Sequence, residues 1–409
     1  MARLKIKNVG PIRAGYEPQN GFIEFKGVTL FIGNQGSGKS TVAKIYSTLS
    51  WIEKALVRGD FTPAYAMKYN RFKKQHLAYQ NLSNYVNDES YIEYIGNAYH
   101  LIYEKSQFVI KKLKEDKSYS FPKIMYVPAE RNFVSSVDRP DLVKRLPLPL
   151  YTFMDEYEDA KQNIGQGLKL PIGNTTIEYK KQSKKAILKG DGYEIDLLEA
   201  SSGFQSLVPL FLVTRHLSEI VKSKGSVSRK NISLEEEERI RKMVSQLLAK
   251  DSISDDVFKA VLEKISSKFR YESFVNVVEE PEQNLFPTSQ KNVLFELLKY
   301  KNQSRQNKLI ITTHSPYIIN FLTLAVKAFQ MIKLNLSDDL KKKIEEIVPK
   351  DSIISGNEVN IYQLEESNGV IVKLQDYKGL PSDENFLNNL LEEFNNDFVQ
   401  LLKIENNAN

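Results

Sequence analysis

The sequence predicts an α/β fold with a mostly parallel sheet, and three stretches of the chain carry this prediction. "FIGNQGSGKSTVAKIY" (31–46) reads as the end of an apolar strand, a glycine-rich turn and the start of a helix. Farther along, "SFVNVV" (273–278) and "KLIITT" (308–313) are apolar runs of strand length, separated by the helical pattern "QKNVLFELLKY". Strands that alternate with helices are typical of a parallel sheet, because parallel neighbours need a crossover connection.

Further segments are expected around this sheet, within one folded unit that spans residues 1–409. Residues 57–120 are rich in tyrosine and mostly helical in period, which predicts an inserted helical lobe. "TTIEYKKQSKKAILKGDGYEIDLLEA" predicts an antiparallel β subdomain around a Gly-Asp-Gly turn. Residues 216–270 predict a second helical insert. Residues 326–409 predict a hairpin and a final helix that complete the head. Core packing is expected for the apolar positions of this helix, with partner binding as the alternative; they are Leu387, Leu390, Leu391, Phe394 and Phe398.

The composition of the chain excludes several classes of function. Hydrophobic residues make up 41% and charged residues 26% of the chain, as in ordinary globular proteins. The chain has no cysteine, which excludes disulfides, thiolate zinc sites and a cysteine nucleophile. The first residues, "MARLKIKNVGPIR", contain no apolar signal-peptide core, so a cytoplasmic protein without a membrane partner is expected. The net charge of +6 is too small to indicate nucleic-acid binding from bulk charge alone.

The glycine-rich turn fits the pattern G-x-x-x-x-G-K-[ST] and predicts a phosphate-binding loop. Its glycines allow backbone N–H groups to turn toward anionic oxygens, and the helix that follows adds the positive end of its dipole. In this pattern the lysine reaches the β- and γ-phosphates and the serine hydroxyl binds Mg²⁺. The candidate nucleotide-binding residues are Asn34, Gln35, Gly36, Ser37, Gly38, Lys39, Ser40 and Thr41.

Two acids and a histidine follow the later strands. In "FVNVVEEPEQNLFP" an apolar strand ends in Glu279 and Glu280, the arrangement of a Walker B element. Glu279 is expected to hold Mg²⁺ together with Ser40, and Glu280 to polarise the attacking water. His314 ends the strand in "LIITTHSP", one strand–helix–strand step after Glu280, so we expect it beside the nucleotide and against the γ-phosphate.

A fourth element, "ASSGFQSL" (200–207), precedes an apolar helix, and its N–H groups together with Ser202 can cap that helix and bind a phosphate. The four elements in this order resemble the head of ABC-type ATPases, with Walker A, signature, Walker B and H-switch. By this resemblance Ser202, Gly203 and Gln205 stand at the signature positions for a serine, a glycine and the glutamine, and Phe204 replaces a second glycine. The resemblance implies an ABC-ATPase-like P-loop head that hydrolyses ATP with Mg²⁺.

Within that superfamily, "PAER" (128–131), "SSGFQS", "EEPEQNLFP" and "TTHSP" resemble the SMC- and OLD-like AAA ATPases. These include ATPase subunits of anti-phage systems such as Septu and PARIS and retron-linked ATPases. The chain departs from the usual pattern in three ways. Glu279 replaces the usual aspartate, and Asn284 stands where many relatives carry histidine. No glutamine follows the strand that ends at Val127, so the Q-loop role falls to Glu130 or Arg131.

The resemblance implies a head that pairs with a second copy of itself, in a dimer or a higher homo-oligomer, with the signature acting in trans. It further implies slow ATP hydrolysis that controls a separately encoded effector, a toxin or a nuclease, in antiviral defence. Only 95 residues follow His314, too few for the nuclease domain of OLD proteins. An SMC-like repair or chromosome-maintenance ATPase that clamps DNA is the alternative, so nucleic acid stays an open partner. A transporter subunit fits poorly, because Gln205 and Glu279 are 74 residues apart.

Overall fold

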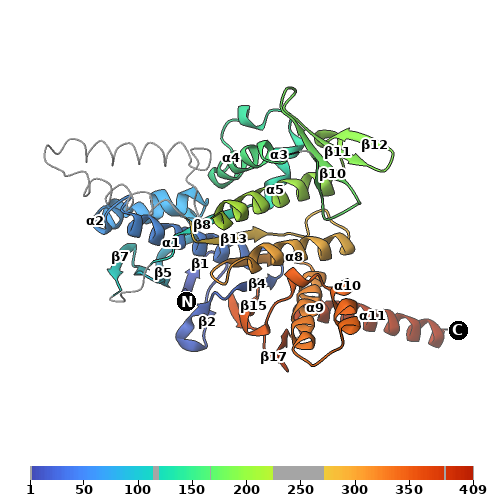
Figure 1. The fold of residues 1–409 in the computed structure, drawn as a ribbon. Helices are drawn as coiled ribbons and strands as arrows, with labels where there is room; N and C mark the ends of the chain where they lie inside the picture. The colour runs from blue at the N-terminus through green and yellow to red at the C-terminus, as the bar shows by residue number, and fades with distance from the viewer. Residues whose placement is uncertain (1, 114–118, 166, 224–270, 382–383, 409) are drawn as a thin grey trace.

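The centre of the computed structural model is a seven-stranded sheet in the order β2-β16-β15-β4-β14-β13-β8 (Figure 1). The five strands from β15 to β8 are parallel to their neighbours, whereas β16 is antiparallel to β15. The strands are β2 Gly15–Tyr16, β4 Val28–Gly33, β8 Pro122–Val127, β13 Ser273–Glu279, β14 Lys308–Thr313, β15 Val359–Leu364 and β16 Val370–Lys373. The expected α/β fold with a mostly parallel sheet is confirmed. The structure describes residues 2–113, 119–165, 167–223, 271–381 and 384–408.

Apolar residues of this sheet point alternately to its two faces. On β4, Leu30 and Ile32 belong to one hydrophobic cluster and Phe31 to another, as the two-residue period of a strand requires. The cluster of Leu30 includes residues of α4 (Leu148–Gln162), α5 (Ser202–Lys222), α8 (Pro287–Asn302) and α9 (Pro316–Ile332). The cluster of Phe31 includes residues of α1 (Lys39–Arg58). The sheet is therefore buried on both faces, which explains its continuous apolar strands.

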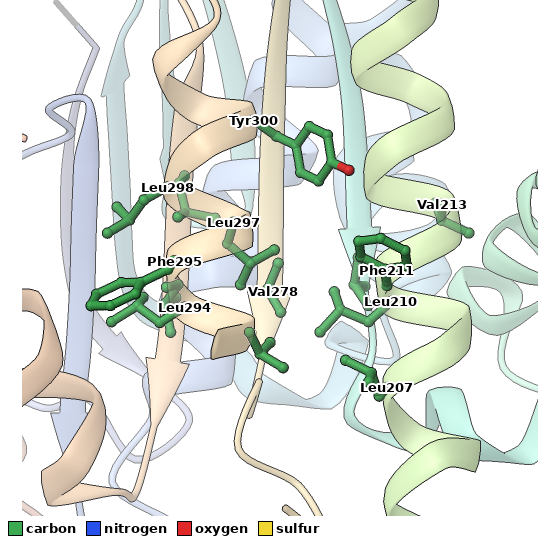
Figure 2. Packing of buried hydrophobic residues seen from close by; sticks show 14 of the residues in the cluster. Leu207, Leu210, Phe211, Val213, Val278, Leu294, Phe295, Leu297, Leu298 and Tyr300 are labelled. Atoms are coloured by element: carbon green, nitrogen blue, oxygen red, sulfur yellow. The ribbon is translucent and has the colours of Figure 1, made fainter. Parts of the chain in front are cut away.

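Helices α5 and α8 pack against each other over strand β13. Figure 2 shows Leu207, Leu210 and Phe211 of α5 on one side of Val278, with the side chains of α8 on the other. The rings of Phe211 and Tyr300 lie 6.5 Å apart between their centroids. This apolar contact fixes the position of α5, whose first turn carries the signature-like residues.

The first antiparallel sheet corrects the expectation of a helical lobe over residues 57–120. Only α2 (Pro63–Met67) and short turns up to residue 85 are helical. The rest of the segment enters a five-stranded sheet in the order β3-β1-β5-β6-β7, formed by β1 Arg3–Val9, β3 Ile23–Glu24, β5 Val86–Ile95, β6 Tyr99–Glu104 and β7 Gln107–Lys112. Tyr94, Tyr99, Leu101 and Tyr103 are buried on alternate positions of β5 and β6. Their period of two residues is that of a strand, and a helical reading of the tyrosines overlooks it.

The second antiparallel sheet confirms the expected β subdomain. Its order is β12-β11-β10-β9, formed by β9 Leu168–Lys169, β10 Thr176–Lys180, β11 Lys185–Gly190 and β12 Tyr193–Asp196. The turn between β11 and β12 is Asp191-Gly192, as the sequence indicates. Before α4, a short helix α3 (Phe133–Ser136) follows β8. A helical insert is expected at 216–270. Its residues from 224 to 270 lie outside the described part of the chain.

The C-terminal part supplies two strands of the central sheet, since β15 lies beside β4 and β16 beside β15. The other elements of this part are α10 Asp338–Ile347, the small β17 Asp376–Tyr377 and β18 Leu380–Pro381, and α11 Phe386–Ala408. Leu387 is buried, but Phe394 and Phe398 are 70% and 56% exposed, so the expected core packing is wrong for these two. Figure 1 shows why, because α11 extends away from the rest of the chain. No described helix is long and apolar enough to cross a membrane.

A buried glutamate joins α1, the helix that follows the glycine-rich turn, to the first antiparallel sheet. Glu53 is 3% exposed, and its carboxylate accepts hydrogen bonds from the backbone N–H groups of Ala98 at 2.6 Å and Tyr99 at 3.1 Å. The Tyr94 hydroxyl donates a third bond at 3.1 Å. These bonds hold the turn between β5 and β6 against the helix.

We expect Glu53→Ala to lower the free energy of unfolding by about 3 kcal/mol, since it leaves the buried N–H of Tyr99 and the partly buried N–H of Ala98 without an acceptor. Glu53→Gln keeps one acceptor oxygen and the shape of the side chain, so its loss should be smaller. Urea unfolding of both variants measures the difference. A loss below about 0.5 kcal/mol for Glu53→Ala would show that the bonds are not made.

Candidate nucleotide site

The expected phosphate loop is the connection between β4 and α1. β4 ends at Gly33 and α1 begins at Lys39. Gly38 caps the helix with a φ of 102°, and a Cβ there would lie 2.8 Å from the side chain of Ile12. A residue with a side chain would be strained in this conformation and crowded in this place. Asn34, Gln35 and Gly36 are exposed, so the loop opens to solvent above the start of the helix.

The side chain of Lys39 bends back across this loop. Its ammonium donates to the carbonyl oxygens of Gly33 at 2.9 Å and Asn34 at 2.8 Å, and lies 3.3 Å from Nδ1 of His314. Burial lowers the pKa of Lys39 to about 8, although three nearby glutamates favour its charged form. The carbonyls hold the ammonium where a bound phosphate could replace them as acceptors.

Glu279 ends strand β13 as a buried carboxylate with spare bonding capacity. One oxygen accepts a bond from the N–H of Ala129 at 3.3 Å, and the other, Oε1, is buried with no hydrogen-bond partner in the described structure. The hydroxyl of Ser37 in the loop is likewise buried without a partner among the described residues. A buried carboxylate oxygen without a donor suits a hydrated divalent cation.

The described residues include no group of three or more His, Asp or Glu side chains placed to hold a metal ion. Mg²⁺ bound with a nucleotide needs only one or two protein ligands, because phosphates and water supply the others. The unpartnered oxygen of Glu279 could supply one such ligand without a dedicated protein cage, and Ser40 stays a predicted second ligand.

Glu280 is held at the same edge of the sheet by its backbone and by His314. Its N–H donates to the carbonyl of Thr312 at 2.8 Å, and its φ is 43°, in the left-handed region that costs energy for a side-chain-bearing residue. The Nε2 atom of His314 lies 3.2 Å from Oε1 of Glu280. This hydrogen bond is the largest cause that lowers the pKa of Glu280. Lys39, His314 and Glu280 thus form one row of side chains across the mouth of the loop.

Glu282, the third acid of "EEPE", has a positioning role that the sequence pattern does not reveal. Its Oε1 accepts from the hydroxyl of Thr313 at 2.6 Å and from the N–H of His314 at 2.7 Å. Burial raises the pKa of Glu282. The carboxylate therefore positions the loop that carries His314, whereas the side chain of Glu280 is partly exposed.

Arg131 is a candidate for the Q-loop role by its sequence position, but the structure places it inside the protein. Its guanidinium is fully buried and donates to the carbonyls of Glu279 at 2.7 Å and Glu280 at 2.6 Å. Its Nε donates to the carbonyl of Ser206, on α5, at 3.1 Å. Burial lowers the pKa of Arg131 to about 10, still far above neutral pH. One cation thus joins the backbone of both strand-end acids to the signature helix, while Glu130 is exposed.

The signature-like residues lie at the start of α5. Ser201, not Ser202, occupies the capping position, and no side-chain capping bond forms there, so the expected capping role of Ser202 is wrong. Ser202 is exposed in the first turn. The side-chain amide of Gln205 donates to the carbonyls of Leu197 and Leu198 at 3.3 and 2.9 Å. These bonds tie Gln205 to the turn that precedes α5.

The same helix start is fixed to the loop after β13. The side-chain amide of Asn284 donates to the Ser206 hydroxyl at 3.0 Å, and a Cβ on Gly203 would lie 3.0 Å from the Asn284 carbonyl. In the described part of the chain, no hydrogen bond joins Ser202, Gly203 or Gln205 to the phosphate loop. The structure therefore brings Lys39, Glu279, Glu280 and His314 together and leaves Ser202 facing outward.

No protein-family model and no curated protein matches the chain. Among solved structures, the chain is similar to an SMC head bound to the C-winged helix domain of ScpA. The identity is 12% and the TM-score 0.37, with 92% of this chain and 98% of that chain covered. A TM-score this low leaves the activity of the present chain open.

Arg131→Met should lower the free energy of unfolding by about 3 kcal/mol or more, because the buried carbonyls of Glu279 and Ser206 and the partly buried carbonyl of Glu280 lose their donor. Arg139→Met is the matched control, since Arg139 is exposed and its guanidinium pairs with the exposed Asp141. We expect the control to change stability by about 0.5 kcal/mol or less. Urea unfolding compares the two variants, and equal losses would contradict a bridging role for Arg131.

Proposed function

We propose that this chain is an ATPase head that binds ATP and Mg²⁺ at the phosphate loop and completes its site with a second copy. The observation that carries the proposal is the row of Lys39, His314 and Glu280 across the open mouth of a G-x-x-x-x-G-K-S loop. Such a row supplies a cation for the phosphates, a group at the γ-phosphate and a carboxylate for water. Each of these is a separate requirement of phosphoryl transfer to water.

Each residue then has a defined task. Backbone N–H groups of residues 34–38 surround the phosphates, and Lys39 transfers its hydrogen bonds from the two carbonyls to the β- and γ-phosphates. Ser40 and Glu279 hold Mg²⁺, which neutralises the charge on the β- and γ-phosphate oxygens. Glu280, held by its hydrogen bond to His314, accepts a hydrogen bond from the attacking water.

The wider role that we infer is antiviral defence, supported by the motif resemblance to the ATPase subunits of anti-phage systems. ATP-driven association of two heads would control a separately encoded toxin or nuclease. The alternative, an SMC-like ATPase that clamps DNA, uses the same site residues. Purification from the native host separates the two, since a co-purifying effector protein supports defence and co-purifying DNA supports the clamp.

Glu280→Gln should bind ATP normally and hydrolyse it at least about 10²-fold more slowly, because it keeps the shape of the side chain but loses the base. Lys39→Ala should lose ATP binding, since no neutral side chain replaces its charge. Binding of a fluorescent ATP analogue and phosphate release measure the two effects. Normal phosphate release from Glu280→Gln would assign the base elsewhere.

Ser202→Arg should leave ATP binding intact and block hydrolysis, because the exposed signature turn is expected to contact the partner's nucleotide. Mixing inactive Lys39→Ala chains with inactive Ser202→Arg chains should restore part of the activity through one hybrid site. The mixture is assayed for phosphate release at several ratios, after labelled chains have been shown to exchange. Absence of rescue would count against a site shared between copies.

The isolated chain should hydrolyse ATP without cutting nucleic acid, because the effector is a separate protein. Purified protein is incubated with Mg²⁺ and labelled DNA or RNA, and the products are separated on gels. Lys39→Ala, purified in the same way, is the control for contaminating nuclease. Cleavage by both proteins that persists through repeated purification would reveal a nuclease site in this chain.

A further inference from the structure

A basic and aromatic surface lies on the segment that follows α1. Residues 61–87 contain four Lys or Arg residues and no Asp or Glu, in contrast to the nearly balanced charge of the whole chain. Lys68, Arg71, Lys73 and Lys74 lie there close in sequence to Tyr65 and Tyr69. The segment follows the C-terminal end of α1, whereas the phosphate loop precedes that helix, and His76 of the segment packs against Trp51 of α1.

The side chains on this surface are open to solvent and stacked on one another. Tyr69 is 78% exposed and Tyr65 47% exposed. The guanidinium of Arg71 lies 3.6 Å from the centroid of the Tyr65 ring and 5.3 Å from that of Tyr69. Lys68 and Lys74 are exposed. We call the five residues Tyr65, Lys68, Tyr69, Arg71 and Lys74 the tyrosine strip.

The strip is held in an energetically costly backbone. Tyr69 and Asn70 both have a positive φ, 57° and 53°, in the region that side-chain-bearing residues rarely adopt. A π-helical turn, Phe72–Leu77, follows at once, and such turns occur frequently at functional sites. Strain of this kind persists only where the surrounding structure enforces it.

Buried apolar side chains hold this backbone conformation in place. Phe72 is fully buried and stacks on Phe108, with ring centroids 4.3 Å apart. Leu77 and Ala66 are also buried in the same cluster. The exposed Tyr69 therefore projects from a turn whose base is packed in the hydrophobic core.

We propose that the tyrosine strip binds single-stranded nucleic acid. Exposed aromatic rings stack on unpaired bases whatever the sequence, and neighbouring lysines neutralise the phosphates. In this arrangement a base stacks on the exposed ring of Tyr69, beside the guanidinium of Arg71. Lys68 and Lys74 contact the phosphates of the nucleic acid on either side. A folded duplex hides the faces of its bases and gains only the charge contacts. This surface lies outside the nucleotide site and does not depend on ATP hydrolysis.

The test measures fluorescence anisotropy of labelled oligothymidine and oligouridine of about 16 nucleotides with the full chain. Wild type should bind, more weakly as salt rises, and better than it binds a duplex of the same length. Tyr69→Ala should weaken binding about 5-fold or more at unchanged stability. The two probes decide between DNA and RNA.

Matched variants separate the strip from general effects. Tyr377→Ala removes a ring that is 67% exposed with the Lys378 ammonium 5.2 Å from its centroid, on β17, away from α2 in Figure 1. It should bind like wild type. Lys68→Glu with Lys74→Glu should abolish binding, whereas the same charge change on exposed Lys342 and Lys343 of α10 should not.

The proposal would be overturned if wild type bound neither probe, if the two double-charge variants lost affinity equally, or if Tyr69→Ala kept full affinity. A preference for the duplex that is insensitive to Tyr69 would also reject stacking. Binding of an acidic peptide to the strip, with no binding of the oligonucleotides, would assign the surface to a protein instead.

Discussion

The candidate site depends on the parallel alignment of three adjacent strands, β4, β14 and β13. In their register, Thr313 of β14 is opposite Ile32 of β4, and Thr312 is opposite Glu279 of β13. Carboxyl ends of parallel strands emerge at one edge of the sheet, so the phosphate loop, His314 and Glu280 leave that edge side by side. If one strand ran in the opposite direction, its polar residues would lie at the other edge and the row from Lys39 to Glu280 could not form.

A buried cation extends this arrangement to the signature helix. Arg131 holds the backbone carbonyls of Glu279 and Glu280 with one end and that of Ser206 with its Nε. Asn284 adds a second link from the loop after β13 to the same helix. A shift of the strand-end acids on nucleotide binding would thus move the start of α5, where Ser202 is exposed. The geometry gives a physical route from the proposed nucleotide site to this exposed helix start.

The sequence predicts those parts of the site that depend on residues close together in the chain. Lys39 belongs to a contiguous motif between a strand and a helix, and Glu279, Glu280 and His314 each end an apolar strand. Their proximity follows once the strands are parallel neighbours. Arg131 and Glu282 cannot be assigned in this way, because their bonds join residues that only the folded chain brings together. The strands between 86 and 112 escape the sequence prediction because their tyrosines alternate with period two, and neighbouring helical turns hide that period.

A site shared between two chains can be tested by cross-linking, since the chain has no cysteine of its own. Gln35→Cys in the phosphate loop and Ser201→Cys before α5 are both exposed positions and can be combined with Glu280→Gln. A short thiol-specific cross-linker and a denaturing gel report whether the two cysteines meet across chains. We expect covalent dimers with ATP and Mg²⁺, and none when Lys39→Ala is added. Dimers formed equally without nucleotide, or linkage confined to a single chain in saturating ATP, would contradict the account.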